Sequence, residues 1–553
     1  MNDLIRKHAL LNAIGHNGKA DAQAVLGKVI AEKPELKDKI AQLVVEIKKI
    51  VGEINALGLD KQKKELEKLG PVKVMPKKKE EGLPSLPDAV KGKVVMRLAP
   101  YPSGPLHIGN ARMVILNDEY AKIYKGKLLL VIDDTIGSEE KFIIPEAYQM
   151  IKDNLQWLCV KYHRMFLKSE RLKLFYKFAE MLINKNIAYI CECDGESLRR
   201  NRLTGVACSH RNIPVAENLK LWKAMLAGKY KEGTAVLRLK TDMQHPNPAF
   251  RDRVLMRIVE RAHPLVGKKY KVWPMLEFSW AVDDYLLGMT HIIRGKDLVI
   301  EDMMENFIWE KMGWKKPEFI HYGFLQVGGV KLSKTEARKL IEKKIYSGWD
   351  DPRTWSMMSL ERRGIQPAAI RKFIVNMGLS QADVSVPEEI LYAENRKIID
   401  AQANRYLAVI DPVEISVVKP PKIKKIEMNL HPDFPRRGRR KISVNLKKIY
   451  VEREDFERFY EKEVGLINLL AVRLKKEADF LSKGIGYDLP KIHWVSEPNV
   501  KIKIVMPDGK VWTALAEKEV KNLKKGSLVQ FYRVGFCRVD KTGKETVLYF
   551  AHK

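Results

Sequence analysis

Residues 97–110, RLAPYPSGPLHIGN, combine the residue types that bind a phosphate group. They follow an apolar run and precede a helix-forming stretch, so their order predicts a strand, a turn rich in Pro and Gly, and a helix N-terminus. The first turn of a helix offers unpaired N–H groups and a positive dipole end to an anion. Gly104 and Gly109 would let a flat nucleotide approach the backbone, and His107 could donate to a phosphate. The segment therefore predicts a site for ATP.

A second segment, 328–335, carries two lysines on a loop that begins with a Gly-Gly pair. Lys331 and Lys334 flank Ser333, and such a cationic loop could neutralise the charge that develops on a leaving pyrophosphate. A Lys-rich loop on its own is most often solvated surface. The first segment strengthens the interpretation of these lysines as phosphate ligands, because both segments would act on the same phosphates.

Four residues have the types and the grouping of a tetrahedral zinc site. Cys191 and Cys193 form a C-x-C pair, and Cys208 and His210 follow in the same part of the chain. Thiolates and an imidazole are the ligands that structural zinc prefers. The C-x-C spacing is tighter than the usual one, and two such cysteines are often simply buried. A zinc site and a pair of buried cysteines both remain open.

An open parallel sheet is predicted to position the nucleotide segment. From 93 to 186 apolar runs alternate with helical patterns, and the run 128–132 has the composition of a buried strand ending at Asp133. Ligands bind at the carboxyl ends of the strands of such a sheet. The strand pattern resumes at 270–273, and a later apolar pair leads to Arg294.

The two ends of the chain differ in character from this middle part. Residues 1–70 have apolar residues at helical spacing, and a linker rich in Pro and Lys follows at 71–90. Such a helical module could dock on the body or contact a protein or RNA, and both interpretations stay open. The segment 188–269 is less regular, and 337–395 has a helical pattern. From 406 onward β-branched runs are separated by turn signals such as Asp508-Gly509, which predicts β-barrels; the runs lie at 414–418, 442–444, 501–505 and 527–531.

Composition bounds the class of protein. The chain has 553 residues, too many for one core, so three or more domains are expected. It has 100 Lys and Arg against 69 Asp and Glu, a net charge of +31, which favours a polyanionic partner such as nucleic acid over a solvated basic surface. Five cysteines argue for a reducing compartment. We predict a cytoplasmic protein with no membrane partner, since there is neither a long apolar run nor a secretory signal.

The chain resembles a known family. Segments 97–110 and 331–335 are similar to the two signature motifs of class I aminoacyl-tRNA synthetases, and the chain as a whole resembles archaeal-type glutamyl-tRNA synthetases from about residue 90 to 553. The resemblance continues through WPMLEF at 273–278, DDYLLGMTH at 283–291, IRGKD at 293–297, SGWDDPRT at 347–354, AVIDP at 408–412 and HPDFP at 431–435.

The resemblance implies a multidomain α/β plus β fold with a Rossmann-type catalytic core. The expected parts are an N-terminal helical module (1–70), a linker (71–90), the first catalytic half (91–187), an inserted domain that binds the acceptor end (188–269), the second catalytic half with the lysine loop (270–336), a helical connector (337–405) and anticodon-binding β-barrels (406–553). It also implies a two-step reaction that depends on bound tRNA: L-glutamate and Mg²⁺-ATP form glutamyl-adenylate, and the terminal ribose hydroxyl of tRNA(Glu) then takes the glutamyl group.

The family's site residues carry over by position. For glutamate, Asp133 matches the partner of the ammonium, Arg97 the ligand of the side-chain carboxylate, and Arg294 a second cation that separates glutamate from glutamine. A surface salt bridge remains the alternative role for Arg294. The ATP ligands would be Pro100, Ser103, Gly104, His107, Gly109, Asn110, Lys331, Leu332, Ser333 and Lys334, with His107, Asn110, Lys331 and Lys334 also catalytic. Asp351 and Arg353 match the family's connector to the inner face of the L-shaped RNA. By its charge, and not by the resemblance, the basic run 436–441 adds predicted phosphate contacts at Arg436, Arg437, Arg439 and Arg440, although it also fits a solvated loop.

Three positions depart from the family pattern. Asn110 stands where many class I enzymes have His, and Asn can donate but cannot carry charge. Val131-Ile132 stands where many relatives have Arg-Phe, and Leu276 stands where many place a Tyr that contacts the substrate. Leu276 is therefore left out of the predicted site.

Other functions compete with this interpretation. A glutaminyl-tRNA synthetase shares the barrels and much of the catalytic core, and Arg294 is the residue that separates the two. A non-catalytic tRNA-binding paralogue is disfavoured by the intact His107, Lys331 and Lys334. A nucleotidyltransferase with a similar His-x-Gly turn would leave the barrels and the basic charge unexplained. Archaeal-type enzymes also suggest, by analogy, that tRNA(Gln) is glutamylated too and finished by an amidotransferase.

Overall fold

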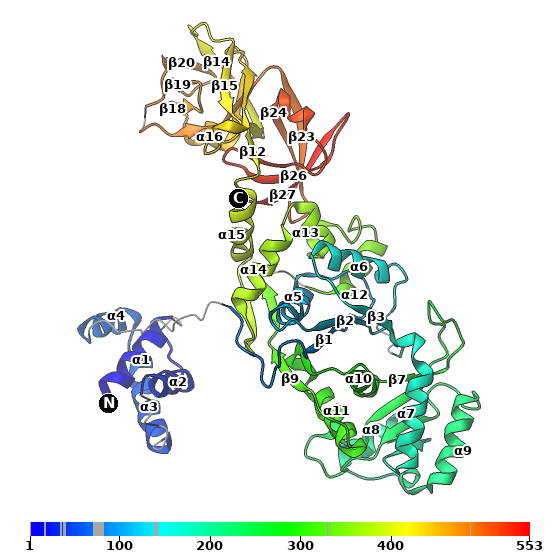
Figure 1. Cartoon of the computed structure of the whole chain (residues 1–553). Helices are drawn as coiled ribbons and strands as arrows, with labels where there is room; N and C mark the ends of the chain where they lie inside the picture. The colour runs from blue at the N-terminus through cyan, green and yellow to red at the C-terminus, as the bar shows by residue number, and fades with distance from the viewer. Residues whose placement is uncertain are drawn as a thin grey trace. The chain divides into compact units, whose positions relative to one another are not determined.

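The computed structural model describes residues 2–15, 18–33, 36, 40–69, 82–137, 142–328, 330, 332–486 and 488–553 (Figure 1). It divides into two compact units, Met1–Glu81 and Gly82–Lys553. Lys331 lies outside the described residues, as do residue 70 and residues 71–81 of the predicted linker. No helix in the described residues combines the length and the apolar composition needed to cross a bilayer.

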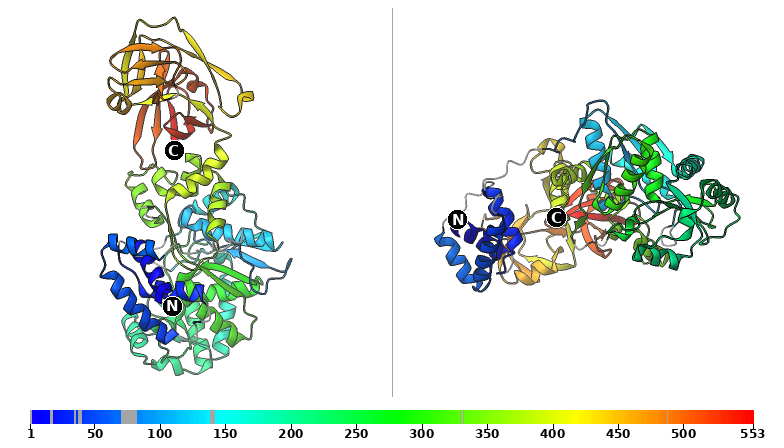
Figure 2. Two further views of the ribbon diagram at one scale, coloured as in Figure 1. Left: turned by 90° about the vertical axis from the view of Figure 1, so that its left-hand side faces the viewer. Right: turned by 90° about the horizontal axis from the view of Figure 1, so that it is seen from below.

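The first unit is a small helical bundle, shown from two sides in Figure 2. Its helices are α1 (Asn2–Gly15), α2 (Ala22–Glu32), α3 (Ile40–Asn55) and α4 (Leu59–Lys68). Apolar residues spaced three or four apart put one stripe of each helix inside, including Ile5, Val25, Ile47 and Ile54. The amphipathic helices expected over 1–70 are therefore present.

A parallel sheet lies at the centre of the second unit. Strands β1 (Val95–Leu98), β2 (Lys127–Ile132) and β3 (Arg164–Leu167) pair in parallel, as do β8 (His291–Gly295) and β9 (Glu318–Tyr322). A backbone hydrogen bond of 3.0 Å from Thr290 N to Val95 O sets β8 beside β1. The helices α5 (Ile108–Ile123), α6 (Ala147–Trp157), α10 (Leu276–Leu286) and α11 (Val299–Met312) connect or cover these strands. The carboxyl ends of β1, β2 and β8 thus meet at one edge.

The segment 188–269, expected to be less regular, is an ordered domain. An antiparallel sheet runs in the order β4 (Ala188–Cys191), β5 (Val236–Leu239), β6 (Val254–Ile258), β7 (Val272–Pro274), with α7 (Leu172–Asn184), α8 (Gly195–Thr204) and α9 (Val215–Leu226) around it. The strand predicted at 270–273 is present, but it pairs with β6 and not with the parallel sheet. Strands this short carry too few residues for their partner to be inferred from periodicity.

The connector is helical, with one exception. Its helices are α12 (Lys334–Glu342), α13 (Met357–Arg363), α14 (Pro367–Met377) and α15 (Glu388–Ile399). A short strand β11 (Val384–Val386), inside the stretch predicted as helical, pairs in parallel with β10 (Leu325–Val327). This pairing draws the connector back onto the catalytic core.

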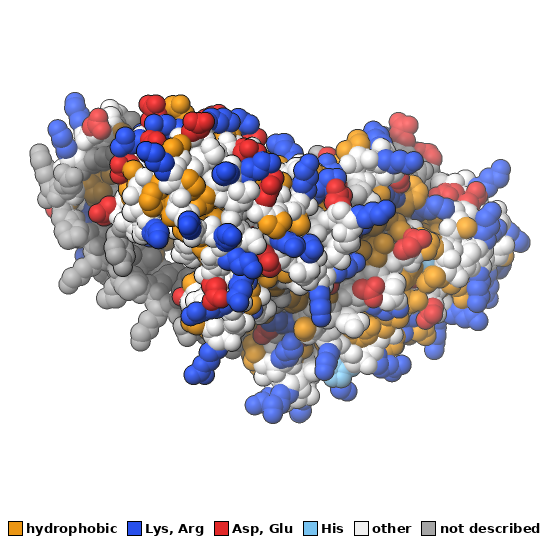
Figure 3. Space-filling model, turned by 90° about the horizontal axis from the view of Figure 1, so that it is seen from above, with side chains coloured by type: hydrophobic (Ala, Val, Ile, Leu, Met, Phe, Trp, Pro, Cys, Tyr) orange, Lys and Arg blue, Asp and Glu red, His pale blue; other side chains and the backbone are white. Residues whose placement is uncertain are grey.

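The C-terminal region is built from sheets, as the β-branched runs predict. Among the described residues one seven-stranded sheet has the order β12-β25-β26-β27-β23-β24-β13, and another has the order β21-β18-β19-β20-β14-β17-β22. The elements are β12 (Asn404–Tyr406), β13 (Ala408–Ile410), β14 (Pro412–Val418), β15 (Lys425–Asn429), β16 (Arg439–Ser443), β17 (Ile449–Glu452), α16 (Arg453–Arg458), β18 (Glu463–Leu466), β19 (Leu470–Arg473), β20 (Glu477–Ser482), β21 (Lys491–Ile492), β22 (Trp494–Ser496), β23 (Asn499–Val505), β24 (Val511–Glu517), β25 (Leu528–Phe531), β26 (Gly535–Lys541) and β27 (Thr546–His552). Lys and Arg side chains cover far more of the face seen in Figure 3 than Asp and Glu side chains do.

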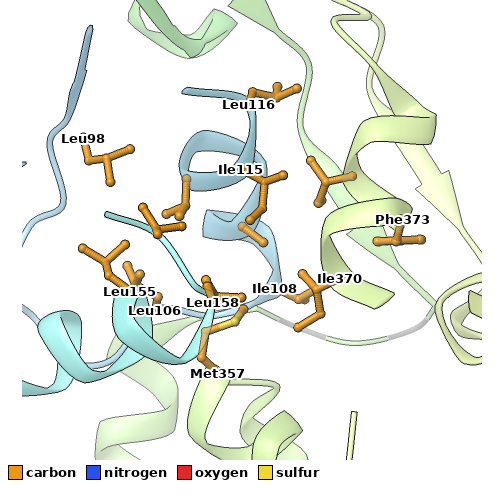
Figure 4. Close-up of a cluster of buried hydrophobic side chains, with 14 of the residues drawn as sticks. Leu98, Leu106, Ile108, Ile115, Leu116, Leu155, Leu158, Met357, Ile370 and Phe373 are labelled. Carbon is orange, nitrogen blue, oxygen red and sulfur yellow. The ribbon is translucent and has the colours of Figure 1, made fainter. Parts of the chain in front are cut away.

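The main hydrophobic core surrounds α5, which begins at the nucleotide segment. Leu98 of β1, Leu155 of α6, Met357 of α13 and Phe373 of α14 lie around Ile115 of α5 in one cluster of buried side chains (Figure 4). Packing on several sides fixes the N-terminal end of α5, and with it the predicted phosphate site.

Candidate active site

A cleft of about 300 Å³ opens at the N-terminal end of α5. The predicted ATP residues Pro100, Ser103, His107, Asn110 and Lys334 line it, although Lys334 and Gly104 are 230 residues apart in the sequence. The two signature segments therefore converge on one space, as the nucleotide hypothesis requires. The other lining residues are Ala99, Tyr101, Leu106, Met113, Phe142, Thr335 and Arg338.

His107 is held at the start of α5 by its own backbone surroundings. It is the N-cap, its Nδ1 accepts from Gly109 N at 3.1 Å, and Asn110 Oδ1 accepts from His107 N at 3.2 Å. Accepting at Nδ1 leaves the ring proton on Nε2. Burial, and then the neighbouring Lys334 ammonium, lower the pKa of His107 to about 3. The imidazole is therefore a neutral donor at physiological pH.

Lys334 begins α12, so a second helix N-terminus faces the same cleft. Ser333 caps this helix by accepting from Glu336 N at 3.2 Å, and Lys334 Nζ donates to Gly104 O at 3.4 Å. Burial lowers the pKa of Lys334 to about 8. Two helix N-termini and an ammonium group around one cleft suit a polyphosphate.

The glycines of the nucleotide segment are required by protein side chains. Gly104 has φ +138°, and a Cβ there would lie 2.9 Å from the Trp349 ring. A Cβ on Gly109 would lie 2.9 Å from the His107 ring. The predicted role of these glycines is to let a nucleotide approach the backbone. The rings of Trp349 and His107 give a second reason why no side chain fits at these two positions.

The sequence missed some of the residues that line the cleft. Arg338 follows Lys334 by one helical turn, and its guanidinium carbon lies 4.8 Å from the ring centroid of Phe142. The i,i+4 spacing is the signal that could have found Arg338. Of the predicted ATP ligands, Gly104, Gly109, Leu332 and Ser333 are not among the lining residues, and Lys331 lies outside the described residues.

Arg97, Asp133 and Arg294 are buried at the carboxyl ends of β1, β2 and β8. Their charges are already paired inside the protein. Arg97 Nη2 donates to Asp284 Oδ2 at 2.8 Å, and Asp133 Oδ2 lies 3.4 Å from Lys168 Nζ. The surface salt bridge considered for Arg294 is excluded, because this residue is 4 % exposed.

Arg294 is shared between two carboxylates of α11. Its Nη1 donates to Glu305 Oε1 at 2.9 Å, and its Nη2 contacts Asp302. Asp302 also contacts His321 Nε2 of β9. Burial and the Arg294 charge lower the pKa of His321, so that His321 stays neutral at physiological pH.

Trp280 of α10 is the centre of this polar cluster. Its ring centroid lies 4.6 Å from the guanidinium carbon of Arg97, 4.8 Å from that of Arg294 and 5.0 Å from Lys168 Nζ. Cations over an aromatic face are stabilised by its quadrupole. The ring brings residues from several strands and helices together, a proximity that the sequence alone did not reveal.

The four predicted metal ligands form one cluster. The ligand atoms of Cys191, Cys193, Cys208 and His210 all lie within 4.8 Å of one another. The distance from Cys191 Sγ to Cys208 Sγ is 3.8 Å, and Cys193 Sγ lies 3.5 Å from His210 Nδ1. These distances are close to the edges of a tetrahedron with Zn–S bonds of about 2.3 Å, so the donor set fits zinc.

Two of the predicted tRNA contacts, Asp351 and Arg440, are buried in the structure. Asp351 is 3 % exposed, caps a 3₁₀ turn and binds Arg353 at 2.8 Å. Arg440 is 6 % exposed and pairs with the buried Glu517 at 2.9 Å. Both side chains bind other groups of the protein, and their contact to tRNA stays a prediction.

The exposed arginines of the same run remain available. Arg436, Arg437 and Arg439 lie at the surface next to and on β16. Arg437 donates to the backbone oxygens of Ala401 and Gln402, at 2.7 and 2.6 Å. Arg353 is half-buried, and its guanidinium carbon lies 4.3 Å from the Tyr346 ring centroid.

Comparison with known proteins agrees with this geometry. Residues 93–401 match the model of the catalytic domain of class I tRNA synthetases (E and Q), and residues 403–485 and 491–540 match two models of the anti-codon binding domain of the same class. The glutamate–tRNA ligase of Methanothermobacter marburgensis is 40% identical over 100% of both chains. That of Pyrococcus abyssi is 44% identical over 99% of both, and that of Methanocaldococcus jannaschii is 41% identical over 100% of both. The cleft, the sheets and these full-length similarities together place the chain in the family of class I tRNA synthetases for glutamate and glutamine.

Proposed function

We propose that this protein is a glutamate–tRNA ligase. It would activate L-glutamate with ATP and transfer the glutamyl group to the 3′ end of tRNA(Glu). One observation supports the proposal most directly: His107 and Lys334, from two distant signature segments, line the same cleft. The full-length relatives named glutamate–tRNA ligase support the choice of amino acid.

The first step is a displacement at phosphorus. The α-carboxylate oxygen of glutamate forms a bond to the α-phosphate of ATP, and the bond from that phosphorus to the bridging oxygen breaks, so that pyrophosphate leaves. His107 Nε2 would donate to the phosphates, and the Lys334 ammonium would neutralise charge on the leaving group. Asn110 would add a neutral donor. Mg²⁺, when bound with ATP, lowers the phosphate charge further.

The second step needs no enzyme nucleophile. A ribose hydroxyl at the end of tRNA attacks the glutamyl carbonyl, its proton leaves with AMP, and the anhydride bond breaks. Correct placement of the two substrates supplies most of the acceleration in such a reaction.

Glutamate would lie at the edge where β1, β2 and β8 end. Asp133 would accept from the ammonium group, and Arg97 and Arg294 would face the side-chain carboxylate. Since Arg97 and Arg294 already pair with Asp284, Asp302 and Glu305, their charge is only partly available to a substrate. This partial neutralisation affects specificity.

Cys191, Cys193, Cys208 and His210 would hold a structural zinc ion in the inserted domain. Arg238 Nη1 lies 3.7 Å from both Cys191 Sγ and Cys208 Sγ, which favours thiolates. The ion would fix the loops that carry its ligands and has no role in the chemistry proposed above.

Arg353, Arg436, Arg437 and Arg439 are proposed as contacts to tRNA phosphates. We also propose that tRNA(Gln) is charged with glutamate, which would require an amidotransferase downstream. A cytoplasmic location stays a prediction from composition.

Aminoacylation of purified tRNA(Glu) and tRNA(Gln) with labelled glutamate and glutamine tests the proposal. Glutamate on tRNA(Glu) is the expected product, and glutamate on both tRNAs would establish relaxed tRNA choice. Glutamine on tRNA(Gln) would show a glutaminyl-tRNA synthetase. Tight tRNA binding without ATP–pyrophosphate exchange would show a non-catalytic paralogue.

A further inference from the structure

The cations around the predicted glutamate pocket are neutralised from within. Arg97 pairs with Asp284, Lys168 faces Asp133, and Arg171 pairs with Asp283 at 2.7 Å. Arg294 faces two carboxylates, Glu305 and Asp302. A glutamate side chain would therefore bring one more negative charge into a buried region whose positive charges are already matched, which is unfavourable.

Glu305 is the carboxylate that could remove this conflict. It is 0 % exposed, and only its Oε1 is used, as the acceptor from Arg294 Nη1 at 2.9 Å. Within the residues that the structure describes, Glu305 Oε2 has no hydrogen-bond partner. A buried carboxylate oxygen without a donor is costly, whereas a protonated oxygen becomes a donor itself.

The surroundings of Glu305 also favour a proton. Burial, the largest effect, and Asp284 on α10 raise the pKa of Glu305, while Arg294 on β8 and Arg97 on β1 lower it, and the net result is a pKa raised to about 7. Asp302 lies one turn earlier on α11, facing the neutral His321 of β9. At about pH 7, therefore, close to half of the molecules would carry a proton on Glu305.

Two buried donors of the polar cluster around Trp280 have no acceptor among the described residues. Among the described residues, Trp280 Nε1 and Arg294 Nε are buried without a hydrogen-bond partner. The Arg294 guanidinium carbon is 4.8 Å from the Trp280 ring centroid, so both donors belong to one locality. A carboxylate or an amide oxygen of a substrate side chain would satisfy them.

We propose that Glu305 binds a proton when L-glutamate enters, and that this proton sets the choice between glutamate and glutamine. Ionised, Glu305 competes with the substrate carboxylate for Arg294. Protonated, it is a neutral donor to that carboxylate. The ionised form suits glutamine instead, because it can accept from the side-chain NH₂ group. This inference rests on the proposed glutamate activation.

The test measures kcat/KM for glutamate and for glutamine in ATP–pyrophosphate exchange, at saturating ATP and tRNA, from pH 6.5 to 8.5. In the natural protein, kcat/KM for glutamate should fall above pH 7, approaching about tenfold per pH unit, while that for glutamine holds or rises. Glu305→Gln removes the titration, so its glutamate profile should be flat from pH 6.5 to about 7.5, below the range in which Lys334 loses its proton. Glu310→Gln, on the exposed side of the same helix, is the matched control and should keep the natural profile.

A second measurement does not depend on a variant. Calorimetry of glutamate binding, with tRNA and a non-hydrolysable ATP analogue, in buffers of different ionisation enthalpy should show proton uptake at pH 7.5. No uptake, or a pH profile shared by the natural protein and Glu305→Gln, overturns the inference. Failure to activate glutamate at any pH, including 6.5, overturns the proposed function instead.

Discussion

The backbone of His107 pairs with that of Ser356 in an isolated antiparallel β-bridge. Two neighbouring hydrogen bonds extend it, from Ile108 N to Trp355 O at 3.1 Å and from Met357 N to Leu106 O at 2.8 Å. The turn that would bind ATP is thereby attached to the start of α13. Because these backbone hydrogen bonds join the two segments, a displacement of α13 would shift His107 as well.

The same helix is tied to the C-terminal sheets. Arg362 donates to both oxygens of Asp540 on β26, at 3.0 and 2.8 Å, and Arg363 Nη2 donates to Ala551 O on β27 at 2.8 Å. The helix α13 thus connects the sheet that carries β26 and β27 to the ATP turn. This continuity of bonded groups is a physical route for coupling between the C-terminal sheet and the ATP turn.

Arg362→Ala should lower the efficiency with which the protein uses tRNA. Loss of this partly buried bidentate pair, worth about 1 kcal/mol, would lower kcat/KM for tRNA roughly fivefold and leave the KM for ATP unchanged. Steady-state aminoacylation measures both. Lys541→Ala, which removes an exposed cation next to Asp540, is the control and should match the natural protein. An equal loss in both variants would point to net charge and against the α13 link.

The pH dependence of ATP use should report Lys334. Its pKa of about 8 means that the ammonium is present below pH 8 and is lost as the pH rises above it. We expect kcat/KM for ATP to fall above pH 8 by up to about tenfold per unit. His107, with a pKa of about 3, should add no limb between pH 5 and 8. Lys334→Arg keeps the charge and should move the limb beyond pH 9; an unmoved limb would assign it to another group.

Local chemistry makes the ATP site predictable. A strand, a Pro- and Gly-rich turn and a helix N-terminus are recognisable from a few adjacent residues, so the amino-acid sequence predicts a nucleotide site at His107. Lys334 is predicted from its cationic loop together with the family resemblance, and both roles remain predictions. The strand ends at Asp133 and Arg294 follow from the apolar runs that precede them. Lys331 rests on the same reasoning and remains a prediction.

Tertiary proximity explains what the sequence did not show. Glu305 and Trp280 lie on the helices α11 and α10, and the neighbours of these helices depend on the order in which the chain connects the strands. No local sequence pattern therefore links either residue to Arg294. Arg440 is different. It alternates on β16 with the exposed Arg439 and Lys441 and shares the inward face with Ile442, so a period of two predicts its burial. The basic composition of the run concealed that signal.

Arg294→Ala should abolish glutamate activation and destabilise the protein. Glu305 and Asp302 would be left buried without their cation, a change that costs about 3–5 kcal/mol for a buried pair. Thermal or denaturant unfolding measures the stability, and ATP–pyrophosphate exchange measures the activity. Adding Glu305→Gln to Arg294→Ala should recover much of the stability and none of the activity. Recovery of both would show that Arg294 acts only through the fold.

The purified protein should contain about one zinc ion per chain. The double variant Cys191→Ala, Cys193→Ala should lose the ion, since two of the four ligands disappear, and should melt at a lower temperature. Cys159→Ser, at an exposed cysteine outside the cluster, is the control and should retain it. Metal analysis near zero in a natively folded natural protein would leave the cluster as buried thiols beside Arg238.

Arg436 and Arg440 should respond differently to removal, although both lie in the same basic run. Arg436→Ala should weaken tRNA binding and reduce the slope of log K against log salt by roughly one, with unchanged unfolding, because an exposed phosphate contact releases one counterion. Arg440→Ala should chiefly lower stability, since it leaves Glu517 buried and unpaired. Binding titrations at several salt concentrations and melting curves separate the two effects. An unchanged salt slope for Arg436→Ala would identify the run as a solvated loop with no contact to tRNA.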